Sequence, residues 1–153
     1  MNKTAKTIIN RLIKENEKIG RYIFAYMTKD NHYWFTDRYI ALRVPESLGY
    51  SIEEQDMFTP FVDKILEDPC RHEMRVIPPV TALREMKKEG ARHFDFGFNK
   101  PMFQIKYLID AIQAVGSNPV MIYTDKPYFP VLFKGDEEDT LVVLCPCKKG
   151  DTK

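Results

Sequence analysis

The sequence lacks the features that mark several common protein classes. It contains no run of about 18 apolar residues, so no membrane-spanning helix is expected. Its three cysteines, Cys70, Cys145 and Cys147, are too few for a disulfide framework, which favours a cytoplasmic protein with reduced thiols. Lys and Arg number 23 against 22 Asp and Glu, so the formal charge of +1 creates no global field that would draw the chain to nucleic acid.

Recognisable catalytic motifs are also missing. The sequence has no Gly-rich phosphate loop and no HExxH or GxSxG pattern. His32, His72 and His93 have no nucleophile motif beside them, and the acidic run at 136–139 is typical of a solvated turn. We therefore expect a protein that is not an enzyme and that uses no cofactor.

The cysteines invite a zinc interpretation, because four Cys or His ligands can close a tetrahedral site. Cys145 and Cys147 flank Pro146, and Cys70 lies two residues before His72. The paired Cys-x₂₋₄-Cys spacing of structural zinc sites is absent, however, and the C-terminal pair lies in or beside an expected strand. Cysteine acting as a small buried apolar residue accounts for this pattern, so no metal is expected.

What the chain does contain is enough apolar sequence, 44% of residues, for the core of a single domain over residues 1–148, followed by a disordered tail at 149–153. Apolar residues at i, i+3 and i+4 predict a helix over 4–19 that ends at Gly20. Aromatic and β-branched residues predict strands over 21–28 and 32–44, joined by a turn at 29–31.

An insertion of different texture follows at 46–92. A capping-box pattern at 51–54 predicts a helix to about Leu66, residues 73–77 a short strand, and 81–89 a compact basic helix closed by Gly90. Beyond it, we expect a strand at 93–98, a helix at 103–115 and strands at 120–124, 129–134 and 140–145. Both ends of the chain thus show a helix followed by about three strands, a weak duplication of organisation that predicts the α+β class.

The region from Phe103 onward carries a more specific signal. The helix pattern FxxxYLxDAxxA at 103–114, the Thr-Asp pair at 124–125 and the ending VVLCPCK at 142–148 resemble the bacterial DNA polymerase III beta subunit, the beta sliding clamp. In the first half, FTDRYI at 35–40 is similar to the Ala-Thr-Asp-Gly-His-Arg-Leu hairpin of that family. The chain departs from the family in having room for one domain rather than three, and in its insertion at 46–92.

The resemblance implies a DNA-clamp-like domain built from two helix-plus-antiparallel-strand halves. In the family, the sheets form the outside of a six-domain ring and the helices line the hole for DNA. The implied function is that of a DNA-replication processivity factor, which holds partner proteins near DNA without catalysis. A ring would require six copies of this chain, joined through sheet edges. The alternative is a monomeric or dimeric protein-interaction module that has kept the fold and lost ring formation and DNA encirclement.

The resemblance also implies a peptide-binding pocket. In the family, replication and repair proteins dock a short motif between the Thr-Asp hairpin and the C-terminal strand, which come from adjacent domains. Carried onto this chain, the two walls are Thr36, Asp37, Arg38, Tyr39 and Ile40, and Val143, Leu144, Pro146, Cys147 and Lys148. The plain alternative is that the Thr-Asp pair forms only a turn and the last strand only core.

Sequence-independent contacts to double-stranded DNA would come from the helices. The candidates are Lys3, Lys6, Arg11, Lys14 and Lys18 on the first helix and Lys106 on the second. The plain alternative is a solvated helix face, diluted by Glu15 and Glu17. On the second helix, Lys106 and Asp110 are spaced to pair at i, i+4.

Overall fold

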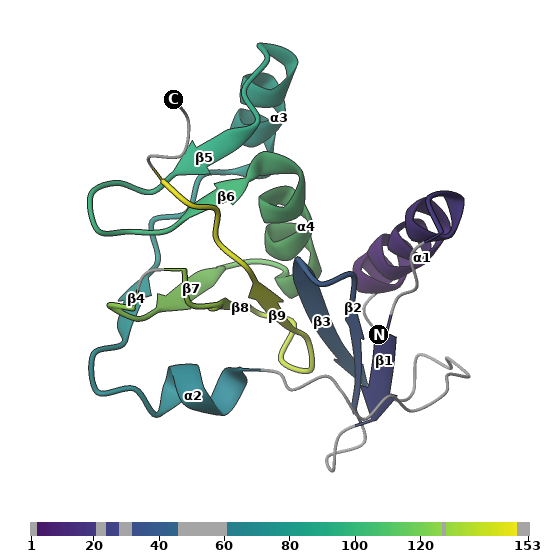
Figure 1. Cartoon of the computed structure of the whole chain (residues 1–153), viewed down its shortest axis with the longest axis horizontal. Coiled ribbons are helices and arrows are strands. Elements are labelled where there is room, and N and C mark those ends of the chain that lie inside the picture. Colours follow the sequence, from purple (N-terminus) through teal and green to yellow (C-terminus); the bar gives the residue numbers. More distant parts are fainter. Residues whose placement is uncertain (1–2, 21–23, 28–31, 46–60, 127, 150–153) are drawn as a thin grey trace.

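The structure is a computed structural model that describes residues 3–20, 24–27, 32–45, 61–126 and 128–149. These ranges hold four helices and nine strands, which confirms the α+β class (Figure 1). Seven strands form one antiparallel sheet in the order β1-β2-β3-β9-β8-β7-β4. Their bounds are β1 Phe24–Met27, β2 His32–Thr36, β3 Ile40–Pro45, β4 His72–Met74, β7 Val120–Tyr123, β8 Val131–Lys134 and β9 Leu141–Leu144.

Helices cover both faces of this sheet. On one face lie α1 (Lys3–Lys18), α3 (Val80–Lys88) and α4 (Ile105–Val115), whose apolar side chains share a core with β3, β8 and β9. On the other face, the short helix α2 (Val62–Leu66) buries Ile65 in a second, smaller apolar cluster. The α4 helix lies between α1 and α3 and contacts both. This position explains why nine of its eleven residues are buried.

The two halves of the chain meet at the centre of the sheet. The first half contributes α1 and the meander β1-β2-β3, and the second half contributes α4 and the meander β7-β8-β9. The meanders join through the antiparallel pair β3–β9, in which Ile40 lies opposite Leu144. Each meander therefore runs outward from this central pair, β3-β2-β1 on one side and β9-β8-β7 on the other. The α1 and α4 helices are in contact on the same face of the sheet. The expected repeat of a helix and three strands is confirmed at the level of element order.

The insertion extends the sheet and covers its helices. Strand β4 pairs with β7, which removes the β7 edge from the surface, and α3 packs beside α4. The basic helix expected at 81–89 is thus confirmed, and the expected strand is shorter than predicted. Of the helix expected from residue 51, the structure describes only the last turns in α2, because 46–60 lie outside the described residues. The turn at 29–31 also lies outside them.

The second half departs from expectation at its start. Residues predicted to open a helix at Phe103 instead form β6 (Met102–Gln104), which pairs with β5 (His93–Asp95) in a separate two-stranded hairpin. Phe103 is fully buried against Phe96 and Phe133, so its packing outweighs the local helical pattern. None of the helices in the described ranges is long and apolar enough to cross a membrane.

Candidate functional site

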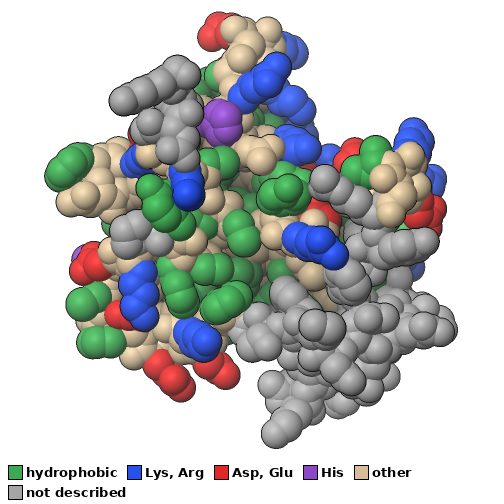
Figure 2. Space-filling view, in the orientation of Figure 1, with side chains coloured by type: hydrophobic (Ala, Val, Ile, Leu, Met, Phe, Trp, Pro, Cys, Tyr) green, Lys and Arg blue, Asp and Glu red, His purple; other side chains and the backbone are tan. Residues whose placement is uncertain are grey.

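A pocket of about 850 Å³ opens where three segments converge: the β5–β6 loop, the β7–β8 turn and the chain after β9. Its apolar lining includes Phe98, Met102, Tyr128, Phe129, Pro146 and Cys147. Figure 2 shows hydrophobic side chains gathered between the β5–β6 hairpin and α2, with Lys and Arg side chains around them. Two of the lining side chains are exposed despite their size, Phe98 at 90% and Tyr128 at 53%.

The β5–β6 wall is held in place by the chain after β9. The Lys149 ammonium lies 2.6 Å from Asp95 Oδ1 and donates a hydrogen bond of 2.5 Å to the Gly97 carbonyl. The Cys147 amide donates to the Met102 carbonyl at 2.7 Å. A two-stranded hairpin is marginal by itself, so these contacts decide where it lies. Of the tail expected at 149–153, the structure describes only Lys149, which makes these contacts; residues 150–153 lie outside the described ranges.

The Asp95 carboxylate contacts both Lys149 and the backbone of its own loop. It also accepts a hydrogen bond from the Gly97 amide at 2.9 Å. Partial burial raises the pKa of Asp95, but the hydrogen bonds from Lys149 and Gly97 and the charge of Lys149 outweigh it, so the pKa lies below its usual value. The carboxylate is thus ionised and bound to Lys149 at neutral pH.

The β7–β8 wall is tied to the insertion. Thr124 Oγ1 accepts a hydrogen bond from the Lys126 amide at 3.2 Å, which shapes the turn. Asp125 Oδ1 lies 2.6 Å from His72 Nε2, and Lys126 Nζ lies 3.5 Å from the carboxylate of Asp68. Tyr128 adopts a φ of 64°, an uncommon conformation for a bulky residue. The insertion therefore positions this wall as well as covering the β7 edge.

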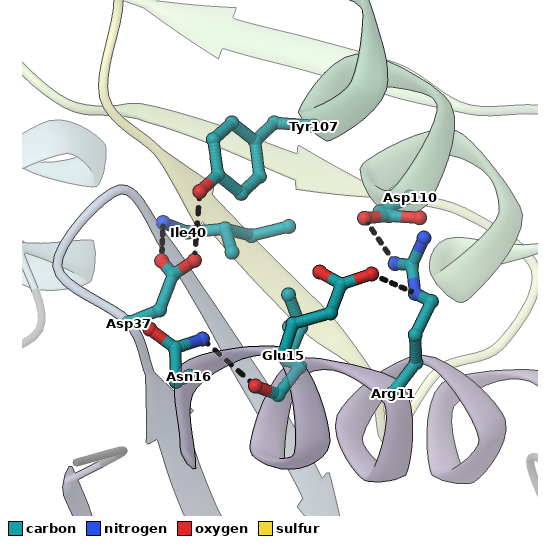
Figure 3. Close-up of polar contacts among 8 residues, drawn as sticks. Arg11, Glu15, Asn16, Asp37, Ile40, Tyr107 and Asp110 are labelled. Carbon is teal, nitrogen blue, oxygen red and sulfur yellow. Dashed lines mark hydrogen bonds and ion pairs between the residues drawn. The ribbon is translucent and has the colours of Figure 1, made fainter. Parts of the chain in front are cut away.

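The hairpin predicted as a peptide-binding wall is tied to helix α4 through the carboxylate of Asp37 (Figure 3). Asp37 is 5% exposed, and its Oδ1 accepts hydrogen bonds from the amides of Tyr39 and Ile40 at 2.9 and 3.0 Å. Its Oδ2 accepts a hydrogen bond from the Tyr107 hydroxyl of α4 at 2.8 Å. Burial and the neighbouring Asp37 carboxylate raise the pKa of Tyr107 well above its usual range. These contacts fix the β2–β3 turn to α4.

One backbone feature of this turn is uncommon for a residue other than glycine. Arg38 has a φ of 82°, a left-handed conformation that glycine adopts without strain. The Arg38 amide donates to Thr36 Oγ1 at 3.0 Å, the same local turn that Thr124 makes with Lys126.

Five of the predicted peptide-binding residues are buried: Thr36, Asp37, Ile40, Val143 and Leu144. Ile40, Val143 and Leu144 are 1%, 5% and 1% exposed, because β3 and β9 pair in the middle of the sheet and their side chains enter its two cores. A peptide cannot reach them in the folded chain. Thr36 is likewise 5% exposed, whereas Arg38 and Tyr39 lie at the surface.

The remaining predicted residues lie at or beside the pocket. Pro146 and Cys147 line it, and Lys148 Nζ lies 5.7 Å from the ring of Tyr128. The wall opposite them is formed by the β7–β8 turn and the β5–β6 loop rather than by the β2–β3 hairpin. A signal for this turn exists in the sequence, because Thr124-Asp125-Lys126 repeats the pattern of Thr36-Asp37-Arg38. Turn-forming residues occur in the β5–β6 loop as well, at Gly97, Asn99 and Pro101, but nothing in the sequence places that loop beside the β7–β8 turn.

The predicted DNA-contacting residues are at the surface. Lys3, Lys6, Arg11, Lys14 and Lys18 are all exposed on α1, and Lys106 is exposed on α4. Arg11 also binds Asp110 across the α1–α4 interface at 2.5 Å (Figure 3). Burial raises the pKa of Asp110, although the Arg11 guanidinium opposes that rise. The predicted partner of Asp110, Lys106, instead places its Nζ 4.8 Å from the ring of Tyr107.

The cysteines are not arranged as a metal site. Among the residues that the structure describes, no group of three or more His, Cys, Asp or Glu side chains could hold a metal ion. Burial raises the pKa of the Cys145 and Cys147 thiols, and His72 is bound to Asp125 rather than placed for coordination with Cys70.

No protein-family model, curated protein or solved structure matches the chain. The sliding-clamp resemblance therefore stays a prediction.

Proposed function

We propose that this chain is a non-catalytic accessory protein with a clamp-like fold, which holds a partner protein by docking a short apolar segment of that partner in the pocket. The observation that carries the proposal is the pocket itself, with Phe98 and Tyr128 exposed at its mouth and Pro146 and Cys147 in its lining. Large apolar side chains gathered around a concavity mark binding sites more often than they serve stability.

The fold supports the clamp-like part of this proposal. Two units, each a helix followed by three strands, meet at the β3–β9 pair with their helices side by side on one face. The resemblance implies two such halves. The Thr-Asp turn, with Arg38 in the conformation that Gly adopts, supports the same assignment.

The chemistry of the pocket fits a peptide. Apolar surfaces from Met102, Phe129 and Pro146 can bury the partner's anchoring side chains, while lysines at the rim can fix its polar groups. The chain itself supplies every wall of this pocket, whereas the family pocket needs two adjacent domains. We therefore propose that one copy binds its partner alone, which favours a protein-interaction module over an obligatory ring.

The proposal is tested by titrating the protein with a fluorescein-labelled peptide that carries a bacterial sliding-clamp binding motif, followed by fluorescence anisotropy. Phe98→Asp should weaken binding at least about tenfold, because a charge replaces an apolar contact in the mouth of the pocket. Phe98 is so exposed that folding should not suffer. Val76→Asp is the matched control, since Val76 is 86% exposed and does not line the pocket.

Light scattering on the same samples measures the mass of the free and bound protein. A monomer that binds the peptide with one-to-one stoichiometry is the expected result. Equal binding by the Phe98→Asp variant and the unchanged protein would place the peptide elsewhere. Complete absence of binding would remove the docking function.

A further inference from the structure

The charged side chains around the pocket differ in whether the chain already supplies them with a partner. The charged residues of the lining are Asp95, Lys100, Asp125, Lys126 and Lys149. A further lysine, Lys148, lies beside the lining with its Nζ 5.7 Å from the ring of Tyr128. We name the four lysines, 100, 126, 148 and 149, the lysine rim. Which of these charges remain available decides what kind of ligand the pocket favours.

Both carboxylates of the lining already have partners. The Asp95 carboxylate lies 2.6 Å from the Lys149 ammonium and accepts a hydrogen bond from the Gly97 amide. Asp125 Oδ1 lies 2.6 Å from His72 Nε2. A positively charged ligand group would have to displace one of these partners. The pocket therefore has no vacant carboxylate among its described lining residues for a basic ligand.

Two lysines of the rim, in contrast, have no carboxylate partner. Lys126 Nζ lies 3.5 Å from the carboxylate of Asp68, and Lys149 is bound to Asp95. Within the ranges that the structure describes, neither Lys100 nor Lys148 forms an ion pair. Lys100 is half-buried in the lining and Lys148 is exposed beside it. These two side chains are available for the carboxylates of a ligand.

The available lysines accompany the exposed aromatic residues of the mouth. Phe98 and Lys100 lie in one turn, which the Lys100 amide closes by donating a hydrogen bond of 3.0 Å to the Gly97 carbonyl. Lys148 is the lysine whose Nζ faces the ring of Tyr128. Figure 2 shows the same mixture of hydrophobic side chains with Lys and Arg side chains around them. A ligand that covers both rings would thus meet cations as well as apolar surface.

We propose that the pocket selects an acidic linear segment of a partner protein, in which aspartate or glutamate residues flank an apolar anchor. This inference rests on the proposed docking function and names the kind of partner that the pocket accepts. The anchor packs against Phe98 and Met102, and the flanking carboxylates pair with Lys100 and Lys148. Charge complementarity of this kind speeds association and discriminates between partners.

Single-stranded nucleic acid is a less suitable ligand, although it is also negatively charged and can stack its bases on aromatic rings. Much of the lining is aliphatic, including Met102, Val131 and Pro146. Asp95 and Asp125 also line the pocket and would repel a backbone that carries a charge at every nucleotide. A peptide can place its few carboxylates at the two available lysines alone.

The test compares three fluorescein-labelled peptides that share one sliding-clamp binding motif and have capped ends. Two Asp, two Asn or two Lys residues flank the motif on each side. Anisotropy with the full chain at about 50 mM salt should show the Asp-flanked peptide binding about fivefold more tightly than the Asn-flanked peptide. The Lys-flanked peptide should bind more weakly than both. At about 500 mM salt the differences should fall below about twofold, because salt screens the exposed charges.

A double variant then assigns the preference to its residues. Lys100→Gln combined with Lys148→Gln should bind the Asp-flanked and Asn-flanked peptides equally, while its affinity for the Asn-flanked peptide stays within about twofold of the unchanged protein. The control combines Lys14→Gln with Lys87→Gln, which removes the same charge from exposed positions of α1 and α3 outside the pocket. The control should keep the full preference, and circular dichroism checks that both variants fold.

The outcomes separate this inference from the docking function. If all three peptides bind the unchanged protein equally, the docking function stands and the acidic preference is overturned. If the control loses the preference as fully as the Lys100 and Lys148 variant, the assignment to the rim is wrong. If no peptide binds, the docking function fails and this inference falls with it. Tighter binding of a labelled oligothymidylate than of the Asp-flanked peptide would overturn the assignment to a protein segment.

Discussion

The ammonium of Lys149 lies 2.6 Å from a carboxylate oxygen of Asp95, and this contact joins the end of the described chain to a hairpin outside the main sheet. Lys149 also donates a hydrogen bond to the Gly97 carbonyl, so its side chain contacts both the last residue of β5 and the loop that follows it. The loop carries Phe98 into the mouth of the pocket. The shape of the candidate binding site thus depends on Lys149, which belongs to no strand of the main sheet.

Replacing Lys149 should therefore weaken peptide binding without unfolding the protein. Exposed ion pairs contribute about 0.2–1 kcal/mol, and the added charged hydrogen bond brings the expected loss in peptide affinity for Lys149→Ala to about tenfold. Lys149→Arg should restore most of it. Anisotropy with the labelled peptide measures affinity, and thermal melting should show little change. Unchanged affinity in Lys149→Ala would mean that the loop holds its position alone.

The same contact predicts how binding responds to pH. Because the pKa of Asp95 is lowered in the folded protein, the contact contributes fully above the unfolded value of 3.8 and is lost only as the pH falls through the lower folded value. Peptide affinity should therefore be insensitive to Asp95 between about pH 5 and 8. A loss of affinity in that range that disappears in Asp95→Asn would contradict this assignment.

Replacing the two partners of the ion pair between Arg11 and Asp110 should change the free energy of unfolding in different ways. Arg11→Ala leaves a buried carboxylate without its cation, and we expect a loss of about 1–3 kcal/mol in the free energy of unfolding, reduced because Arg11 is 45% exposed. Asp110→Asn should be neutral or stabilising at pH 7. Burial raises the pKa of Asp110 in the folded protein. The free energy of unfolding should therefore fall as the pH rises from 3.8 through the raised folded value, and Asp110→Asn should remove this loss.

Urea denaturation of both variants at about pH 7 and about pH 4 measures this difference. The gap between Asp110→Asn and the unchanged protein should narrow at the lower pH, where Asp110 is more protonated. A loss above about 1 kcal/mol for Asp110→Asn at pH 7 would show that the attraction of Arg11 outweighs burial.

Glycine at position 38 should stabilise the protein. Arg38 has a φ of 82° in the β2–β3 turn, where a side chain costs about 1 kcal/mol relative to glycine. The greater freedom of glycine in the unfolded chain offsets part of this gain, so Arg38→Gly should raise the free energy of unfolding by about 0.5 kcal/mol. Denaturant unfolding measures the change. Arg38→Ala keeps the strain and serves as the control, and a gain for alanine equal to that for glycine would refute the backbone explanation.

A bound peptide should protect Cys147 from alkylation. Cys147 lines the pocket, whereas Cys70 lies exposed outside it. Burial raises the pKa of the Cys147 thiol, so its reaction with iodoacetamide should already be slower than that of Cys70. Saturating peptide should slow it further, while Cys70 reacts as before. Peptide mapping by mass spectrometry resolves the two sites, and equal rates at Cys147 with and without peptide would exclude the pocket as the docking site.

Local sequence patterns predict those helices and strands whose apolar residues follow a single helical or strand spacing. The helix at α1, the basic helix α3 and strands β7 to β9 all occur close to their expected positions, because amphipathic spacing and turn residues act over a few neighbours. Phe103 shows where this reasoning failed. It has the spacing of a helical residue but pairs with Phe94 across a hairpin, since contacts with Phe96 and Phe133 decide its conformation.

The residues that the resemblance implies for a peptide-binding site fall into two groups in the structure. Pro146 and Cys147 line the pocket. Ile40 and Leu144 were assigned to the same site, yet they face each other across β3 and β9 and are buried. Whether an apolar strand residue lies in a core or a pocket depends on which strand becomes its neighbour, and sequence spacing does not specify that.

By itself, the sequence determined the α+β class, the repeated order of a helix and three strands, and the Thr-Asp turns, because these depend on residues close together in the chain. Only the tertiary structure decided that the two meanders join at β3–β9, that Lys149 holds the β5–β6 loop, and that α3 lies beside α4. Each of these depends on contacts between residues far apart in sequence, whose free energy exists only once the sheet has assembled.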